Sequence, residues 1–291
     1  MNPGHVGRLL AAAIFATATP TSAVVQAIDD TGARVTLATP AQRIVSLAPH
    51  ATELLVAAGA GQRIVGAVAA GGGERSIGDA RSLDLERIVA LQPDLIVTWP
   101  YTVPAQVEAL AARGAKVFVT DPKTIDGIAT DIEQLGALAG TDVHARAAAA
   151  AFRDRIARLR SGRSVARPLR VFYQIWNAPL YTVGGRHLVS EAIQVCGGEN
   201  VFASLGLPAP SVTVEAVIAA RPDAIVAGGD GGARPAWLDD WKHWPSIPAV
   251  AHGSLFAVNA DHLHRAGPRF ADGVEQLCAA LDAARRNGVS R

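Results

Sequence analysis

The sequence has 291 residues, of which 49% are hydrophobic and 18% charged, so a sizeable core is expected and a wholly disordered chain is excluded. Its 27 basic and 26 acidic residues nearly cancel, which argues against nucleic acid as the main partner, because a phosphate-binding surface needs excess positive charge. The two cysteines are too few for a disulfide-dense scaffold or a four-ligand zinc site.

The N-terminal residues 1–23 predict a secretory signal peptide. Arg8 precedes the apolar run Leu9–Ala16, and small residues follow as far as Ala23. Cleavage is expected after Ala23 or as late as Ala27, the alternative being a frayed apolar N-terminus. No later segment has 18 uninterrupted apolar residues, so no transmembrane helix is predicted and the chain is expected to be exported.

In the first half of the mature chain, apolar strand-like runs alternate with helical patterns. This βαβα order predicts a parallel sheet covered by helices on both faces, an α/β fold. The expected strands are 43–47, 64–68, 95–99 and 116–120, and the expected helices are 52–58, 85–91 and 107–112.

The second half repeats this organisation. Residues 85–97 and 214–226 share the pattern apolar-Glu, six further residues, then Pro-Asp-x-Ile-Val. Two such units, 129 residues apart, predict two related Rossmann-like lobes and are too few for a solenoid. The expected strands of this half are 169–174, 224–227 and 254–258, and the expected helices are 189–195 and 214–220.

Residues 141–166 separate the two halves. Apolar residues within 143–159 follow helical spacing and arginines fill the polar positions, which predicts one long connecting helix. An ordinary packing helix of a single domain is the alternative. The predicted organisation is therefore an N-terminal lobe over 28–140, this connecting helix, and a C-terminal lobe over 167–291.

Cys196 and Cys278 would meet an oxidising environment in an exported protein, where a disulfide is the default state. Two buried free thiols are the alternative. Both cysteines lie in the last third of the chain, so a bridge between them would fasten one lobe internally.

Candidate ligand-binding residues follow the predicted strands, because ligands of parallel sheets bind just beyond the carboxyl ends of strands. A cleft with Trp and Tyr walls and few charges suits a large, flat, partly apolar ligand. For each ring, ordinary core packing is the alternative. The candidates are Pro49, His50, Trp99, Tyr101, Trp176, Tyr181, Asp261 and His262.

Histidines allow a second interpretation of the same region. His262 and His264 superficially suggest zinc, but alternate residues of one segment do not make a closed site, so no metal site is predicted. An axial role for His50 or His262 toward a bound corrin or haem is favoured over a protein-only metal site. The sequence has no nucleophile elbow, P-loop or dinucleotide-binding fingerprint, so no catalytic residue is assigned.

Glu86 and Glu215 occupy equivalent positions in the two repeats, each in the first turn of a predicted helix. The helix dipole favours glutamate there, so helix capping alone is one interpretation. The other is a matched acidic residue on each lobe that meets basic pockets of a two-fold partner.

Several segments together carry a specific family resemblance. Residues 43–55 and 85–97, and the hairpin pattern of 29–37, resemble the periplasmic ligand-binding proteins of ABC importers for cobalamin, haem and ferric siderophores. Residues 195–202 and 276–278 are most similar to the cobalamin-binding branch, including its disulfide. The resemblance extends from about residue 28 to residue 285.

This resemblance implies two α/β lobes joined by one long helix, with small opening motions. It implies that Glu86 and Glu215 dock onto arginines of the membrane permease. It also places Trp99 and the segment around Trp176 and Tyr181 as walls of the corrin site, with Asp261-His262 near the far side of the cleft.

The chain departs from the family pattern in three places. Residues 67–75 are rich in Ala and Gly and lack an aromatic residue, residues 78–81 lack a Trp, and His262-Leu263 stand where an aromatic residue is common. These departures concern the ligand and leave the expected fold unchanged.

The sequence is accordingly interpreted as a periplasmic, monomeric binding protein without a cofactor of its own. It is expected to capture cobalamin or a related corrinoid and to deliver it to an ABC importer permease with its ATPase, meeting the membrane only through that permease. The alternatives are a haem or siderophore binder, an exported metal-dependent enzyme using His262 and His264, and a partner subunit that no longer binds ligand.

Overall fold

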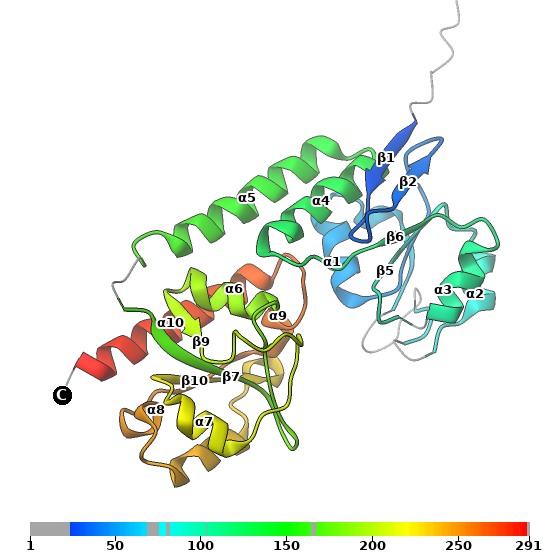
Figure 1. The fold of residues 1–291 in the computed structure, drawn as a ribbon. Helices are drawn as coiled ribbons and strands as arrows, with labels where there is room; N and C mark the ends of the chain where they lie inside the picture. Colours follow the sequence, from blue (N-terminus) through cyan, green and yellow to red (C-terminus); the bar gives the residue numbers. More distant parts are fainter. Residues whose placement is uncertain (1–23, 69–75, 80–81, 103, 164–166, 290–291) are drawn as a thin grey trace, which may run out of the picture.

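The computed structural model describes residues 24–68, 76–79, 82–102, 104–163 and 167–289, which form two α/β lobes linked by a long helix (Figure 1). The fold predicted from the sequence is confirmed. The predicted signal peptide, residues 1–23, lies outside the described residues, as does most of the segment 67–75. Within the described ranges, none of the helices combines the length and apolarity that crossing a bilayer requires.

The N-terminal lobe is built on a four-stranded parallel sheet in the order β4-β3-β5-β6, beside an antiparallel hairpin, β1-β2. Central strands β3 and β5 are buried along their whole length, which explains their continuous apolar sequence. The elements are β1 (Val25–Ile28), β2 (Arg34–Leu37), β3 (Ile44–Ser46), α1 (Pro49–Ala57), η1 (Gly61–Arg63), β4 (Ile64–Ala67), α2 (Leu85–Ala90), β5 (Leu95–Thr98), α3 (Pro104–Ala111), β6 (Val117–Val119) and α4 (Ile125–Ala139).

The C-terminal lobe has a five-stranded sheet that is parallel except for one short strand, β8, which turns back antiparallel on β7. The elements are β7 (Leu169–Asn177), β8 (Leu180–Thr182), α6 (Leu188–Val195), β9 (Gly198–Asn200), α7 (Val214–Ala220), β10 (Ala224–Gly229), η2 (Asp230–Gly232), η3 (Ala236–His243), α8 (Pro248–Ala251), β11 (Leu255–Asn259), α9 (Ala260–Leu263) and α10 (Phe270–Val289).

The sequence repeat has the same local structure in both lobes. Gln92 and Arg221, which precede the two Pro-Asp pairs, both adopt a left-handed backbone with φ of 45°. The Asp94 carboxylate accepts a hydrogen bond from the backbone N–H of Arg43, and the Asp223 carboxylate accepts one from that of Arg170. Each aspartate thus ties its own strand to the start of the neighbouring parallel strand, which accounts for the shared motif.

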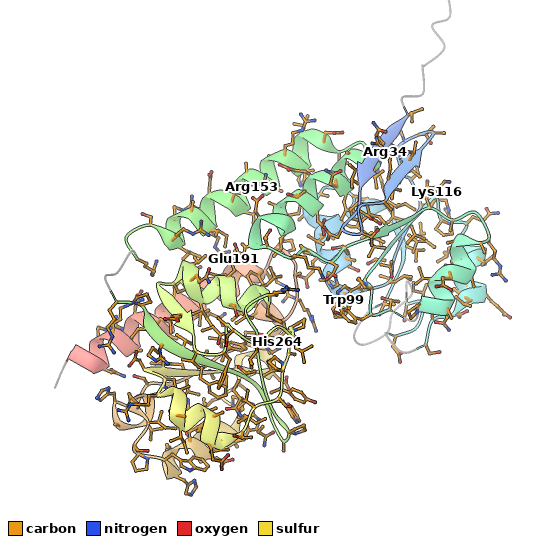
Figure 2. The ribbon with its side chains drawn as sticks, viewed as in Figure 1. Arg34, Trp99, Lys116, Arg153, Glu191 and His264 are labelled. Carbon is orange, nitrogen blue, oxygen red and sulfur yellow. A yellow bond between two sulfur atoms is a disulfide. The ribbon has the colours of Figure 1, made fainter. Side chains whose placement is uncertain are left out.

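Helix α5 (Asp142–Arg160) connects the lobes. Its 19 residues correspond to about 28 Å. Its buried residues recur at the helical spacing of three and four, and arginines on the polar positions contact both neighbours. Arg153 forms ion pairs with Asp126 and Glu133 of α4, and Arg155 with Asp272 and Glu275 of α10 (Figure 2 labels Arg153).

Two further bridges join the lobes directly. The guanidinium of Arg269, just before α10, donates to both carboxylate oxygens of Glu53 in α1, at 3.1 and 2.5 Å. The Glu191 carboxylate of α6 accepts a hydrogen bond from the backbone N–H of Ile125 at 2.7 Å, at the start of α4. These contacts restrain the separation of the lobes in addition to α5.

Cys196, at the end of α6, and Cys278, in α10, form a disulfide with 4.7 Å between their Cα atoms. Both residues are almost fully buried. The predicted bridge is therefore confirmed, and it fastens the C-terminal lobe internally.

Asp131 of α4 is a buried carboxyl group in the N-terminal lobe, with 2% of its surface exposed. Thr120 Oγ1 donates to Asp131 Oδ2 at 2.5 Å. Burial, followed by the negative charge of Asp30, raises the pKa of Asp131 to about 8. At neutral pH the group is therefore protonated in the folded protein, whereas in the unfolded chain it ionises near pH 4.

We expect Asp131→Asn to flatten the pH dependence of stability between pH 5 and 8. Because the folded pKa is raised, the stability that Asp131 contributes is complete below pH 4 and is lost as the pH rises toward 8. The amide of Asn stays neutral and can still accept from Thr120. Thermal unfolding at pH 5, 6, 7 and 8 should show the variant gaining a few degrees in Tm relative to the native protein toward pH 8. Parallel pH profiles would contradict this assignment.

Candidate ligand-binding site

A cavity of about 820 Å³ lies between the two lobes. The N-terminal lobe contributes the start of α1 and the loops that follow β5 and β6, and the C-terminal lobe contributes loops before α6 and after α9. The lining residues that carry the argument are Pro49, His50, Trp99, Tyr101, Thr102, Asp121, Lys123, Arg186, His187, Pro208, His264 and Arg265.

Parallel strands position the N-terminal wall. Helix α1 starts directly beyond β3, with Pro49 at its first turn, where proline is favoured because the missing N–H would have no helical partner. Trp99 and Tyr101 follow β5, the neighbouring strand. Pro49, His50, Trp99 and Tyr101 therefore line one cavity beyond the carboxyl ends of neighbouring strands, and their contact with a ligand stays a prediction.

Three rings form a continuous wall on this lobe. His50 and Trp99 meet edge to face with 5.4 Å between ring centroids, and Trp99 and Tyr101 do so at 4.7 Å. Trp99 is 38% exposed and Tyr101 68% exposed, whereas His50 is almost fully buried. The exposed faces of Trp99 and Tyr101 are available to an apolar ligand.

The histidines of the cavity are neutral at pH 7. Burial lowers the pKa of His50 to about 4, against the opposing charge of Glu53. Burial also lowers the pKa of His187 to about 4, assisted by the nearby His264, and lowers the pKa of His264. His50 Nε2 is buried without a hydrogen-bond partner among the described residues.

The loop before α6 holds part of the C-terminal wall. The backbone N–H of Gly184 donates to the Pro208 carbonyl at 2.9 Å, which ties the loop to residues 206–209 on the same wall. His187 caps α6 by accepting the Val189 N–H on Nδ1. Figure 2 marks His264 on this lobe and Trp99 on the opposite one.

His264 and Arg265 complete the wall at the end of α9. Tyr173, fully buried beneath the cavity, forms a hydrogen bond of 3.0 Å between its hydroxyl and His264 Nε2. Arg265 forms an ion pair with Asp261 at 2.8 Å. Asp261 thus lies behind a lining residue.

Four residues expected at the cleft, Trp176, Tyr181, Asp261 and His262, are not among those that line the cavity. Trp176 and Tyr181 pair across the β7-β8 hairpin, and Tyr181 bridges to Ser211, next to the wall segment 206–209. His262 Nδ1 lies 3.3 Å from the Gln276 side-chain nitrogen. A direct ligand contact for these four residues remains a prediction.

The sequence pattern did not identify Arg186, His187, Arg265, Asp121 or Lys123 as lining residues. Arg186 and His187 follow β8, a three-residue strand without a clear apolar run, so no strand end marked them. Arg265 lies just beyond α9, four residues after Asp261, so it lines the cavity from the same segment as the expected Asp261 and His262.

His262 and His264 have different partners, Gln276 and Tyr173. Among the residues that the structure describes, no three His, Cys, Asp or Glu side chains gather as they would around a metal ion. The arrangement favours binding a large ligand between aromatic rings and neutral imidazoles. It does not resemble a catalytic constellation with a nucleophile and its base.

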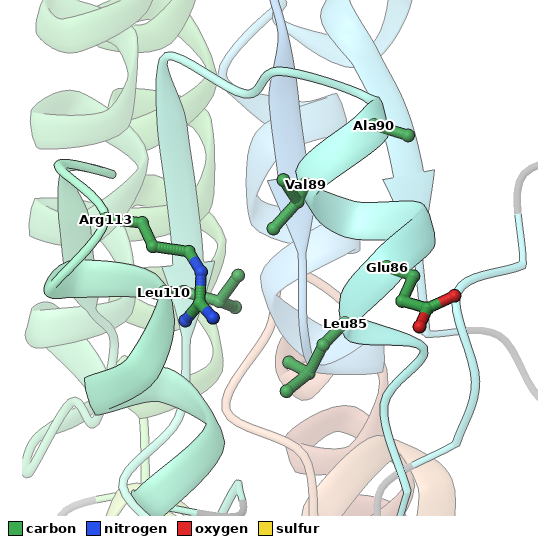
Figure 3. Close-up of a pocket in the computed structure, with 6 residues that line it drawn as sticks. All are labelled: Leu85, Glu86, Val89, Ala90, Leu110 and Arg113. Atoms are coloured by element: carbon green, nitrogen blue, oxygen red, sulfur yellow. The ribbon is translucent and has the colours of Figure 1, made fainter.

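Glu86 and Glu215 lie away from the cavity, one on each lobe. Both are exposed at the second position of a capped helix: the Asp84 side chain caps α2 and the Thr213 side chain caps α7. Glu86 also borders a surface pocket of about 390 Å³ between α2 and α3. Figure 3 shows its carboxylate directed away from Arg113, on the other side of this pocket.

Comparisons with known proteins agree with this geometry. A family model described as "Periplasmic binding protein" matches residues 44–261. The chain is 33% identical to a vitamin B12-binding protein of Vibrio parahaemolyticus over 257 residues, which is 85% of this chain and 92% of that protein. It is 35% identical to the vitamin B12-binding protein of Yersinia pestis over 245 residues, covering 82% of this chain and 85% of the relative.

Solved structures of periplasmic binding proteins have the same fold as this chain. The periplasmic vitamin B12-binding protein of Vibrio cholerae superposes with a TM-score of 0.74 at 33% identity, covering 85% of this chain and 99% of the other. A periplasmic haem-binding protein of Roseiflexus superposes with a TM-score of 0.70 at 26% identity, covering 84% and 98%.

Proposed function

Because the chain belongs to the periplasmic binding protein family, we propose that it captures cobalamin or a related corrinoid in the cavity between its lobes and delivers it to an ABC importer. It is a solute-binding protein and not an enzyme. Relatives named vitamin B12-binding proteins support the corrinoid as ligand.

The observation that carries the proposal is the aromatic-walled cavity between two lobes. Its volume of about 820 Å³ lies in the upper part of the range for small-molecule sites. A corrin is large, flat and apolar on its faces, with amide groups on its rim. Trp99 and Tyr101 supply apolar faces, and Thr102 and the neutral imidazoles supply hydrogen-bonding groups around them.

Haem is the second candidate ligand. The unpartnered Nε2 of His50 and the neutral imidazoles of His187 and His264 are groups that bind iron or its ligands, and a haem-binding protein shares the fold at 26% identity.

Titration of the purified mature protein with cyanocobalamin, hemin and a ferric hydroxamate separates these ligands. Corrinoid binding predicts saturable heat with cyanocobalamin at micromolar concentration or below. The corrinoid proposal fails if neither cyanocobalamin nor cobinamide binds at tens of micromolar. A Soret shift with hemin that is lost in His50→Ala would support haem instead.

Trp99→Ala should weaken corrinoid binding by at least about tenfold, because the ring gives the ligand a large exposed aromatic face. Trp176→Ala provides the comparison, since Trp176 is exposed but does not line the cavity. Calorimetry on both variants measures the two effects. A larger loss for Trp176→Ala would place the ligand on the β7-β8 hairpin and contradict the cavity as its site.

The proposed cellular arrangement follows from the sequence. The segment 1–23 is proposed as a signal peptide that exports the chain. Residues 28–140 and 167–291 are proposed as the two lobes, and residues 141–166, which contain α5, as the connection between them. The exported monomer carries its ligand to a permease that docks on Glu86 and Glu215. It meets the membrane only through that permease and its ATPase.

A further inference from the structure

Arg186 differs from the other cations that line the cavity. Lys123 forms an ion pair with Asp121, and Arg265 with Asp261. Arg186 is exposed and has neither an ion pair nor a hydrogen bond among the described residues. The cavity therefore presents one cation whose charge no neighbouring carboxylate neutralises.

The loop that carries Arg186 is held tightly in place. A Cβ atom added to Gly184 would lie 2.0 Å from the Leu207 carbonyl oxygen, and one added to Gly185 would lie 2.2 Å from that of Ala203. Only glycine permits this close packing, so the backbone just before Arg186 is fixed against residues 203–208. The Arg186 side chain therefore extends from a backbone that is already fixed, so less backbone conformational entropy is lost when its guanidinium binds a ligand.

His187 adds a hydrogen-bond donor beside this cation. Its Nδ1 accepts the backbone N–H of Val189, so the neutral ring carries its proton on Nε2. His187 also begins α6, whose N-terminal dipole favours negative charge. Arg186, the Nε2–H of His187 and the start of α6 together create a positive region on the C-terminal wall.

We propose that Arg186 is an anion subsite that receives the phosphodiester of a corrinoid's nucleotide loop, so that the protein prefers complete cobalamins to cobinamide. The proposal rests on the proposed function. The side chains on a corrin rim are neutral amides, and the phosphodiester is the organic group of cobalamin with a fixed negative charge. Cobinamide lacks the nucleotide loop and has no anion to pair with Arg186.

The test compares cyanocobalamin with dicyanocobinamide on the native protein and on Arg186→Gln, by calorimetry at low ionic strength. Glutamine keeps hydrogen-bonding groups and removes the charge. We expect about tenfold weaker cyanocobalamin binding and less than a twofold change for dicyanocobinamide. Arg186→Lys should restore part of the preference, since it restores the charge without the guanidinium fork.

Arg34→Gln is the matched control, because Arg34 lies exposed on the β1-β2 hairpin, outside the lining residues, and should leave both affinities unchanged (Figure 2). Equal losses for both corrinoids in Arg186→Gln, or no loss for either, would overturn the subsite while leaving the corrinoid function standing. Failure of the native protein to bind either corrinoid would instead overturn the proposed function. Raising the salt concentration should reduce the native preference for cyanocobalamin.

Discussion

Replacing both Glu86 and Glu215 by alanine is expected to abolish corrinoid uptake by cells while the purified protein keeps its affinity for the ligand. Both carboxylates are exposed, and neither forms a salt bridge within the part of the chain that the structure describes. Hydrogen bonds from its own backbone N–H and from Thr213 lower the pKa of Glu215, so it is ionised at neutral pH. Both carboxylates are therefore accessible to basic side chains of a partner protein.

The repeat is the reason to expect that both glutamates are needed for uptake. Each occupies the second helical position of a capped helix, and one stands on each lobe. A partner with two similar basic pockets would engage them together, and the second contact would form intramolecularly once the first is made. Losing either glutamate should then reduce uptake strongly, and losing both should remove it.

Uptake of labelled cyanocobalamin by a strain that carries only the variant measures this effect, and calorimetry measures affinity. Asp154→Ala with Glu199→Ala is a suitable control, because it removes two negative charges from exposed positions elsewhere on the molecule. Normal uptake by the double glutamate variant would exclude the docking role and leave helix capping as the function of both residues. Weakened ligand affinity would show that the variant acts on the cavity.

Removing the disulfide by Cys196→Ala with Cys278→Ala should lower the free energy of unfolding by about 3–5 kcal/mol. The bridge closes a loop across 82 positions of the chain, and its loss enlarges the conformational freedom of the unfolded state. Both positions are buried, so a small packing loss adds to the effect. The change corresponds to a fall in Tm of roughly 10 °C.

Urea unfolding of the native and variant proteins tests this value. Native protein unfolded and refolded in the presence of a reductant should match the double variant, because reduction removes the cross-link and keeps the cysteine side chains. A loss below about 1 kcal/mol would mean that packing of α10 against α6 holds the C-terminal lobe without the bridge.

Much of the fold could be predicted because the two halves obey the same local rules. Helix α7 has the predicted bounds, and β5 and β10 start directly after the two Pro-Asp pairs, as expected. Helices α4 and α10 were not predicted, although α4 buries Ile125, Ile128, Ile132 and Leu135 at helical spacing. The helical spacing of apolar residues was therefore present in the sequence of α4.

The predictable part of the site is the part that follows parallel strands. Pro49 and Trp99 line the cavity because β3 and β5 end at the same sheet edge. Trp176 does not line it, because β7 extends beyond the predicted end and returns as the β7-β8 hairpin. Arg186 is positioned by backbone hydrogen bonds between residues 184–185 and residues 205–208. These contacts join segments that are distant in the sequence, so no local sequence pattern predicts them.

The bridges between the lobes bear on how the ligand would leave. Three features oppose separation of the two cavity walls. They are the ion pair between Arg269 and Glu53, the hydrogen bond from the start of α4 to Glu191, and helix α5. These contacts oppose opening of the cavity, which would slow the release of a bound ligand. If the importer docks on Glu86 and Glu215 as proposed, it would have to supply the work that separates the two lobes, and the energy for release would come from outside this chain.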